Sequence, residues 1–258
     1  VAPEATTGQP SSAWLLGVDF SCAPSSRKPI VAAWGRRHGA VVKLETLELI
    51  TTLAGFEALI SSTHPRSAQG WVGGFDFPFG LPRVFVDALR ADSGLPLADA
   101  TDLISHLRER CPDRQAFQRL IDAWGQQWGP GTRPATLPHR HCDTAMAGVS
   151  STSPLQTRYV PVGKMYFEGL WRLVQAGADL PGLLQEQPAP PVSPHDQDPA
   201  RVAFEAYPGF LAYEILGRQS YKSDAREQTD AARRLVQRLS LSFSGRGRAA
   251  GPRAACPA

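Results

Sequence analysis

The sequence lacks any run of about eighteen apolar residues, which is the length that a transmembrane helix needs. We therefore expect no membrane-spanning segment. Residues 1–13 also lack the basic region and the apolar region that together mark a secretory signal peptide. We expect this stretch to form a disordered lead and the protein to be cytoplasmic.

Cysteine is scarce, and its spacing carries no motif. The chain has four cysteines, none of them in a C-x-x-C pair, so neither a zinc ribbon nor a redox motif is indicated. The stretch LPHRHCD does gather His139, His141 and Asp143, but ligands this close in sequence cannot set up the usual structural zinc geometry. Free thiols in a reducing cytosol are the simpler interpretation.

Neither sign of charge dominates. Lys and Arg number 27 and Asp and Glu 24, so the net charge is +3, which neither requires nor excludes a nucleic-acid partner. A chain of 258 residues with 42% hydrophobic residues can bury a sizeable core without metals or disulfides. Its 23 prolines and 23 glycines predict many loops.

The first ninety residues carry the pattern of a mixed sheet. Three apolar segments between Trp14 and Ile50 are separated by turn signals and predict three antiparallel strands. A helical period follows in residues 51–63, with Thr51 or Thr52 as its N-cap, and WVGGFDFPFGLP returns to strand character. A fourth strand reached through a helix can lie beside the first strand.

The rest of the chain predicts one long helical insertion and a fifth strand. Residues 83–199 are helical and irregular, and the stretches DRQAFQRLIDAWGQQW and MYFEGLWRLVQAG each carry the apolar stripe of a helix. The stretch RVAFEAYPG predicts a strand that is followed by two helices. The composition of residues 242–258 is typical of a disordered tail and resembles a truncated or out-of-frame end. We therefore expect one α/β domain over residues 14–241: a mixed five-stranded sheet flanked by helices, its first three strands antiparallel, with the insertion between strands 4 and 5.

Three acids share one sequence context. Asp19, Asp76 and Glu205 each follow an apolar strand and precede a turn. Ligands of open α/β sheets bind at the carboxyl ends of strands, so these carboxylates are candidate catalytic residues and candidate ligands of Mg²⁺ or Mn²⁺. Two such ions can activate a water and stabilise the leaving oxygen in phosphodiester cleavage. Taken singly, each acid is as well explained as a solvated turn residue.

Two cations are candidate phosphate ligands on chemical grounds. The forked guanidinium of Arg140 can hold phosphate oxygens at two points, and Lys222 in SYKSD can reach a phosphate as a point charge. A solvated loop lysine explains Lys222 equally well. Trp124, Trp128 and Trp171 could stack on bases, but their helical spacing favours the core.

Five motifs in this order, GVDFS, GFDFPFGLP, VGKMYFEG, EAYPG and SYKSD, resemble the predicted-nuclease family called domain of unknown function 429, within the ribonuclease-H-like superfamily. The resemblance covers roughly Leu15 to Leu239. It implies a ribonuclease-H-like sheet, with the first acid at Asp19, the second at Asp76 and Glu205 as a third. It also implies that Arg140 and Lys164 contact phosphate.

The chain departs from this resemblance at its end. Ribonuclease-H-like nucleases usually supply a last acid from a C-terminal helix, and no acidic residue follows Asp230 here. The leading expectation is a metal-dependent nuclease, or another phosphodiester hydrolase, acting on nucleic acid. The missing acid favours two alternatives. One is a catalytically degenerate nucleic-acid-binding module of the same fold, and the other is a truncated, inactive product.

A third class is an ATP-dependent phosphotransferase of the actin and sugar-kinase type, which shares the strand order and the first acid. Such enzymes need Gly-rich phosphate-binding turns, and DFSCAPSSRK has none after its aspartate.

Overall fold

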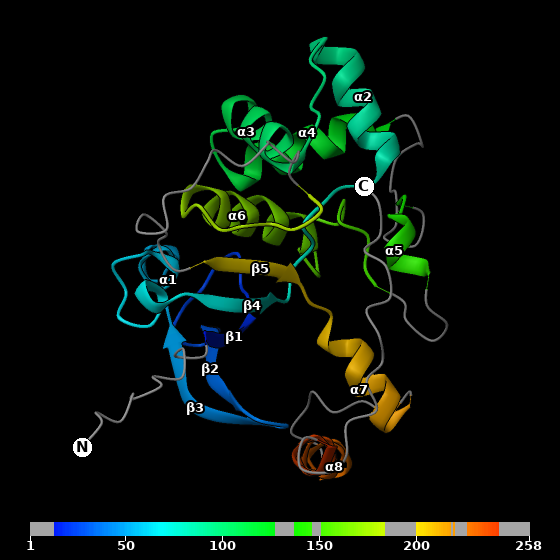
Figure 1. The fold of residues 1–258 in the computed structure, drawn as a ribbon. Helices are drawn as coiled ribbons and strands as arrows, with labels where there is room; N and C mark the ends of the chain where they lie inside the picture. Colours follow the sequence, from blue (N-terminus) through cyan, green and yellow to red (C-terminus); the bar gives the residue numbers. More distant parts are fainter. Residues whose placement is uncertain are drawn as a thin grey trace, which may run out of the picture.

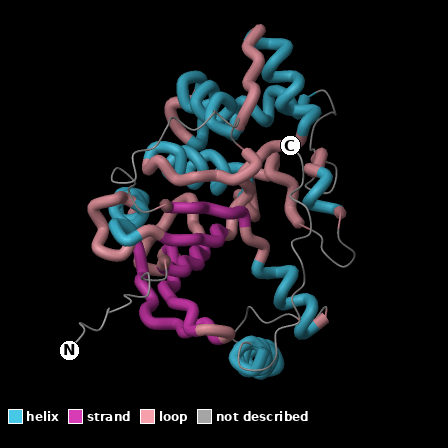
Figure 2. The backbone as a smooth tube through the Cα atoms, in the orientation of Figure 1, coloured by secondary structure: helices cyan, strands magenta, loops and turns pink. Residues whose placement is uncertain are grey.

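The computed structural model describes residues 13–126, 137–145, 151–183, 200–217, 219 and 226–242, with the side chains of the last helix described over 230–238. Its five strands form one sheet (Figures 1 and 2). They are β1 (Trp14–Asp19), β2 (Ile30–His38), β3 (Val41–Ile50), β4 (Trp71–Phe75) and β5 (Arg201–Glu205).

The sheet is mixed, with the strand order β3-β2-β1-β4-β5. Strand β2 runs antiparallel to both β1 and β3, while β4 runs parallel to both β1 and β5. The predicted antiparallel meander and the placement of the fourth strand beside the first are therefore confirmed. Gly39, with φ 60°, forms the turn of the β2–β3 hairpin, where a left-handed conformation suits glycine.

Helix α1 (Leu53–Ile60) connects β3 to β4 and begins where the sequence predicts. The hydroxyl of Thr52 accepts a hydrogen bond from the Gly55 backbone N–H at 3.0 Å, so Thr52 is the N-cap. A short 3-10 turn (Ser67–Gln69) then leads into β4.

The segment between β4 and β5 contributes a layer of helices that lies next to β5 at the top of Figure 1. Helices α7 and α8 follow β5 and lie to the right of the sheet and below it in that view. The helices of the segment are α2 (Arg83–Ser93), α3 (Ala100–Arg110), α4 (Arg114–Gly125), α5 (His141–Thr144) and α6 (Val162–Gln175), and those after β5 are α7 (Pro208–Leu216) and α8 (Arg226–Ser242).

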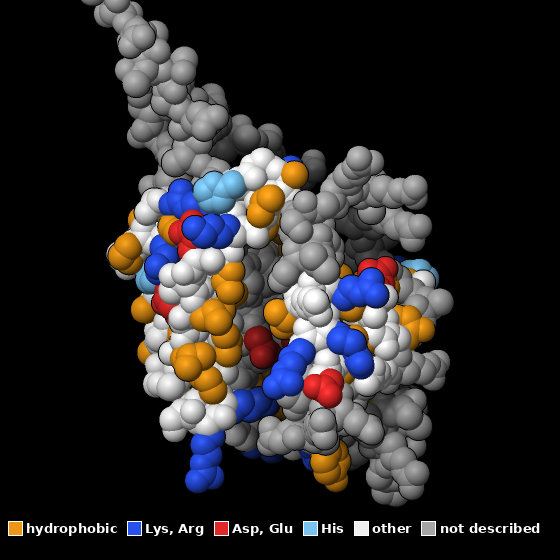
Figure 3. Space-filling model, turned by 90° about the horizontal axis from the view of Figure 1, so that it is seen from below, with side chains coloured by type: hydrophobic (Ala, Val, Ile, Leu, Met, Phe, Trp, Pro, Cys, Tyr) orange, Lys and Arg blue, Asp and Glu red, His pale blue; other side chains and the backbone are white. Residues whose placement is uncertain are grey.

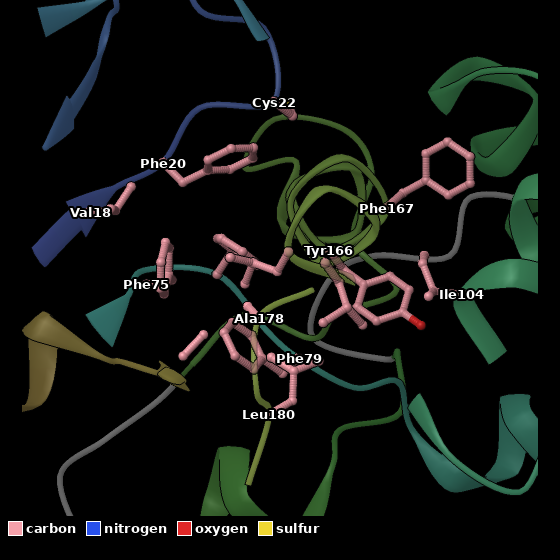
Figure 4. Close-up of a cluster of buried hydrophobic side chains, with 14 of the residues drawn as sticks. Val18, Phe20, Cys22, Phe75, Phe79, Ile104, Tyr166, Phe167, Ala178 and Leu180 are labelled. Atoms are coloured by element: carbon pink, nitrogen blue, oxygen red, sulfur yellow. The ribbon is translucent and has the colours of Figure 1, made fainter. Parts of the chain in front are cut away.

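One face of the sheet is buried and the other is largely open. On β1, Trp14, Leu16 and Val18 point into the core, as the two-residue period of a strand requires. The core continues from these strands to α6, where Phe20 and Phe75 lie toward Tyr166 and its neighbours (Figure 4).

The opposite face leaves apolar side chains exposed, the most exposed being Leu49 at 69%. Figure 3 views the molecule from below and shows hydrophobic side chains along one side of a hollow, with an acidic side chain deep inside it. Among the described residues, no helix combines the length and the apolar character that crossing a membrane demands.

Candidate functional site: two carboxylates at the sheet edge

The parallel strands bring the three predicted acids to one edge of the sheet. Asp19 is the last residue of β1, Asp76 directly follows β4, and Glu205 is the last residue of β5. Because β1, β4 and β5 run in the same direction, their carboxyl ends meet at the same edge. The backbone N–H of Asp76 donates to the Val18 carbonyl at 2.9 Å, so the β1–β4 ladder extends to this aspartate.

The strand register separates the acids onto two faces. Val18 pairs with Phe75, and Phe75 pairs with Glu205, so these three side chains share the core-facing side. Asp19 and Asp76 each come one residue later, and a shift of one residue turns a side chain to the opposite face. Asp19, the last residue of β1, is accordingly exposed on the open face, and Asp76, which follows the end of β4, is half-buried.

Glu205 is held in an ion pair on its own side of the sheet. Its two carboxylate oxygens accept hydrogen bonds from Nη1 and Nη2 of Arg140 at 2.7 and 2.6 Å. Oε2 also accepts from the Phe79 backbone N–H at 2.9 Å. With its side chain 33% exposed, Glu205 forms the solvent-facing end of a small charge network.

Asp143 forms the buried end of this network. Its side chain is 2% exposed and accepts from Nη2 of Arg140 at 2.7 Å and from the Arg140 backbone N–H at 2.8 Å. Burial disfavours the charged guanidinium, but hydrogen bonds to Glu205 and Asp143 outweigh this and raise the pKa of Arg140. All three guanidinium nitrogens of Arg140 donate hydrogen bonds in this network. The carboxylates of Asp143 and Glu205 are both paired with this one cation.

The predicted three-carboxylate cluster is therefore not assembled in one place. Within the described ranges, no group of three or more His, Cys, Asp or Glu side chains is arranged to hold a metal ion. Asp19 and Asp76 follow neighbouring parallel strands, and their carboxylate oxygens could hold a hard cation at this edge. Arg140, predicted to bind phosphate, instead holds Glu205 and Asp143.

The predicted lysines have different outcomes. Lys164 lies in the first turn of α6, is half-buried, and has no ion-pair partner among the described residues. Lys222 lies outside the described residues, as does Trp128. Trp124 and Trp171 pack against the core, which is the role that their helical spacing favours.

Arg114 is a residue near the site that the sequence does not single out. At the start of α4, its Nη1 donates to the Cys22 carbonyl at 2.7 Å and so holds the loop that follows Asp19. The two residues are 92 positions apart, so no local pattern could have revealed this contact. Burial raises the pKa of the Cys22 thiol in this loop, because a thiolate is poorly solvated there.

Comparison of this chain with family models of known proteins, with curated proteins and with solved structures finds no match. Its function is therefore inferred from the geometry of the site.

Proposed function

We propose that this protein is a metal-dependent phosphodiester hydrolase that acts on nucleic acid, a nuclease with a ribonuclease-H-like sheet. One observation carries the proposal. Asp19 at the end of β1 and Asp76 directly after β4 follow neighbouring parallel strands, at the carboxyl edge where α/β sheets bind ligands. Neighbouring strands are about 4.8 Å apart, a separation at which two carboxylates can share one ion.

The two carboxylates fit Mg²⁺ or Mn²⁺. Asp19 has no side-chain partner among the described residues, and two neighbouring carboxylates repel each other unless a cation lies between them. Mg²⁺ is commonly held by one or two carboxylates, with waters and substrate phosphates completing its coordination. A bound ion of this kind supplies an activated water and stabilises the leaving oxygen.

Glu205 has a different role in this proposal. Its carboxylate neutralises Arg140 and accepts from the Phe79 backbone, so it fixes the position of the loop that follows Asp76. Glu205 is thus a positioning residue, and the ion is held by Asp19 and Asp76 alone among the three acids.

The test is cleavage of RNA, DNA and hybrid substrates with and without Mn²⁺. We expect cleavage by the wild type only with the metal, and a loss of about a hundredfold or more in Asp19→Asn and in Asp76→Asn, since weakening even outer-shell support costs 10- to 100-fold. Asp87→Asn, at an exposed acid of α2, is the matched control and should cleave like the wild type. If Asp19→Asn and the wild type behave alike on every substrate, the nuclease proposal fails.

A second candidate is a nucleic-acid-binding module that does not cleave. It is favoured by the small number of ligands, because the third acid is engaged by Arg140 rather than free for a metal. Binding that weakens with salt, together with no metal-dependent cleavage of any substrate, would establish this alternative.

A further inference from the structure

Strand β3 is a long edge strand whose outer side is open. It has ten residues, lies last in the strand order, and pairs with β2 alone among the five strands. Figure 1 shows it at the lower end of the sheet, away from the helices beside β5. Among the described residues, no backbone group of β3 bonds to any segment other than β2. An open edge of this kind is a template for a strand of another chain.

The opposite edge of the sheet is protected, and the contrast singles out β3. Beside β5, the backbone N–H of Asp179 donates to the Arg201 carbonyl at 2.8 Å, and the Asp179 carbonyl accepts from the Ala203 backbone N–H at 2.8 Å. This bridge covers part of a strand that has only five residues. Proteins commonly shorten or cover an edge strand to prevent pairing, and within the described ranges β3 shows neither feature.

Strand β3 turns its apolar side chains away from the core. Its polar side chains lie on the core-facing side, where Thr46 and Glu48 accept hydrogen bonds from Arg66 at 3.3 and 2.7 Å. Its open face carries apolar side chains with exposed fractions of 37% to 69%, namely Val42, Leu44, Leu47 and Leu49. Strands usually bury their apolar side, so this pattern indicates contact with a partner.

A β-bulge in β3 decides which residues share a face. The register with β2 shifts between Trp34 and Gly35, so Glu45 has no partner in β2 and the side-chain alternation of β3 shifts by one residue. Only one antiparallel self-pairing aligns all ten residues, and it places each residue before the bulge opposite one after it. Without the bulge, this pairing would set side chains of opposite faces against each other. With the bulge, the faces match.

We propose that β3 pairs antiparallel with β3 of a second copy of this chain, in the register that aligns all ten residues. Leu44 then lies opposite Leu47 of the second copy, and Val42 lies opposite Leu49. Apolar side chains thus meet on the open face of one continuous sheet. Two-fold symmetry makes each of these contacts occur twice.

Charge complementarity favours a second copy over an unrelated chain. In the same register, Lys43 lies opposite Glu48 of the second copy. Both belong to the core-facing side, because Lys43 pairs with Arg36, whose guanidinium lies 3.9 Å from the ring centroid of the core residue Trp14. Opposite charges directly across an antiparallel pair stabilise it, so the sequence of β3 complements itself.

This pairing leaves the candidate hydrolase site free. Asp19 on β1 lies two strands away from β3, which is about 10 Å at the usual strand spacing. Because β3 and its copy run in opposite directions, the carboxyl ends of β1 in the two chains lie at opposite edges of the joined sheet. Dimerisation therefore does not depend on the proposed activity.

The experiment is sedimentation velocity over a range of protein concentrations in a reducing buffer, with circular dichroism to verify that each variant is folded. The wild type should dimerise. Leu44→Glu/Leu47→Glu sets like charges opposite each other and should be monomeric throughout. Leu44→Lys/Leu47→Glu removes the same apolar groups but sets opposite charges across the pair, so it should still dimerise. Val84→Glu, at an exposed apolar residue of α2, is the control and should dimerise like the wild type.

A single charge reversal tests the other face of the pairing. Lys43→Glu sets a glutamate opposite Glu48 twice in each dimer and should weaken dimerisation about tenfold or more. Lys28→Glu makes the same change of charge at an exposed loop lysine and should have no effect.

A wild type that stays monomeric at every concentration overturns the inference, even if it binds an extended peptide along β3. A dimer that survives Leu44→Glu/Leu47→Glu uses another surface and overturns the inference as well. Equal loss of dimer in both double variants would show that apolar area, and not this strand register, holds the copies together, and the proposed pairing would be wrong.

Discussion

At the scale of single residues, Arg140 connects three parts of the chain. It joins Asp143 in α5 to Glu205 at the end of β5, and Glu205 in turn binds the Phe79 backbone after β4. An ion pair in such a position matters for stability mainly because removing one partner leaves the other charge buried and uncompensated. Asp143 would remain buried as an unpaired carboxylate.

We expect Arg140→Met to lower the free energy of unfolding by about 3–5 kcal/mol, the usual cost of removing one partner of a buried ion pair. Arg140→Lys should recover only part of this, because an ammonium cannot reproduce the forked contacts with two carboxylates. Urea unfolding followed by circular dichroism measures both. Arg158→Met is the control, since Arg158 pairs with Asp122 in an exposed position and such pairs contribute about 1 kcal/mol or less.

A loss below 1 kcal/mol in Arg140→Met would show that Asp143 and Glu205 find other partners. The ion pair would then have no structural importance.

At the scale of elements, α6 packs closely against the turn that follows β4 and carries Phe77 and Phe79. A Cβ atom placed on Gly169 would lie 2.6 Å from the ring of Phe77, which is itself packed among Phe20, Phe75 and Phe79. Glycine is required here because the helix axis approaches the ring too closely for any side chain.

We expect Gly169→Ala to destabilise the protein by about 1–3 kcal/mol, the range for overpacked cores, even though alanine favours the helical conformation. Gly125→Ala in α4 is the matched control. A Cβ there meets no atom within 4 Å, so this variant should be as stable as the wild type or more stable by up to about 1 kcal/mol. Thermal and urea unfolding of both variants provide the measurement, and equal stabilities would contradict the close contact with Phe77.

The elements differ in how far the sequence predicts them. The strands and α1 follow from alternation, turn residues and the Thr52 cap, and α4 and α6 follow from their apolar stripes. Helices α2 and α3 were expected only as part of a helical region. Their buried residues, Phe85, Val86 and Leu89 in α2 and Leu103, Ile104 and Leu107 in α3, do lie at helical spacing, so this local signal is present in the sequence.

At the scale of the whole molecule, the sheet and the helices between β4 and β5 share one core. Residues of β1 and β4 and residues of α3, α4 and α6 belong to the same buried cluster. Phe117 of α4, for example, stacks on Phe167 of α6 with their ring centroids 4.9 Å apart. The helical segment is therefore not an appended unit.

We expect a single cooperative unfolding transition. Native-state hydrogen exchange should give the amides of β1 and those of α6 the same opening free energy at moderate urea, because neither can open without exposing the shared core. Exchange in α8 serves as the internal reference for local opening. An α6 that opens at clearly lower urea than β1 would show that the helical segment unfolds separately.

The sequence by itself determined the elements of the sheet, its antiparallel start and the position of three acids at strand ends. It could do so because alternation, turn residues and caps act over a few neighbouring positions. It could not determine which acids meet. The strand register turned Asp19 to the open face and Glu205 to the core side, where Arg140 reaches it from 65 residues away. Only the tertiary structure decided this, because register and long-range ion pairs depend on how distant segments pack.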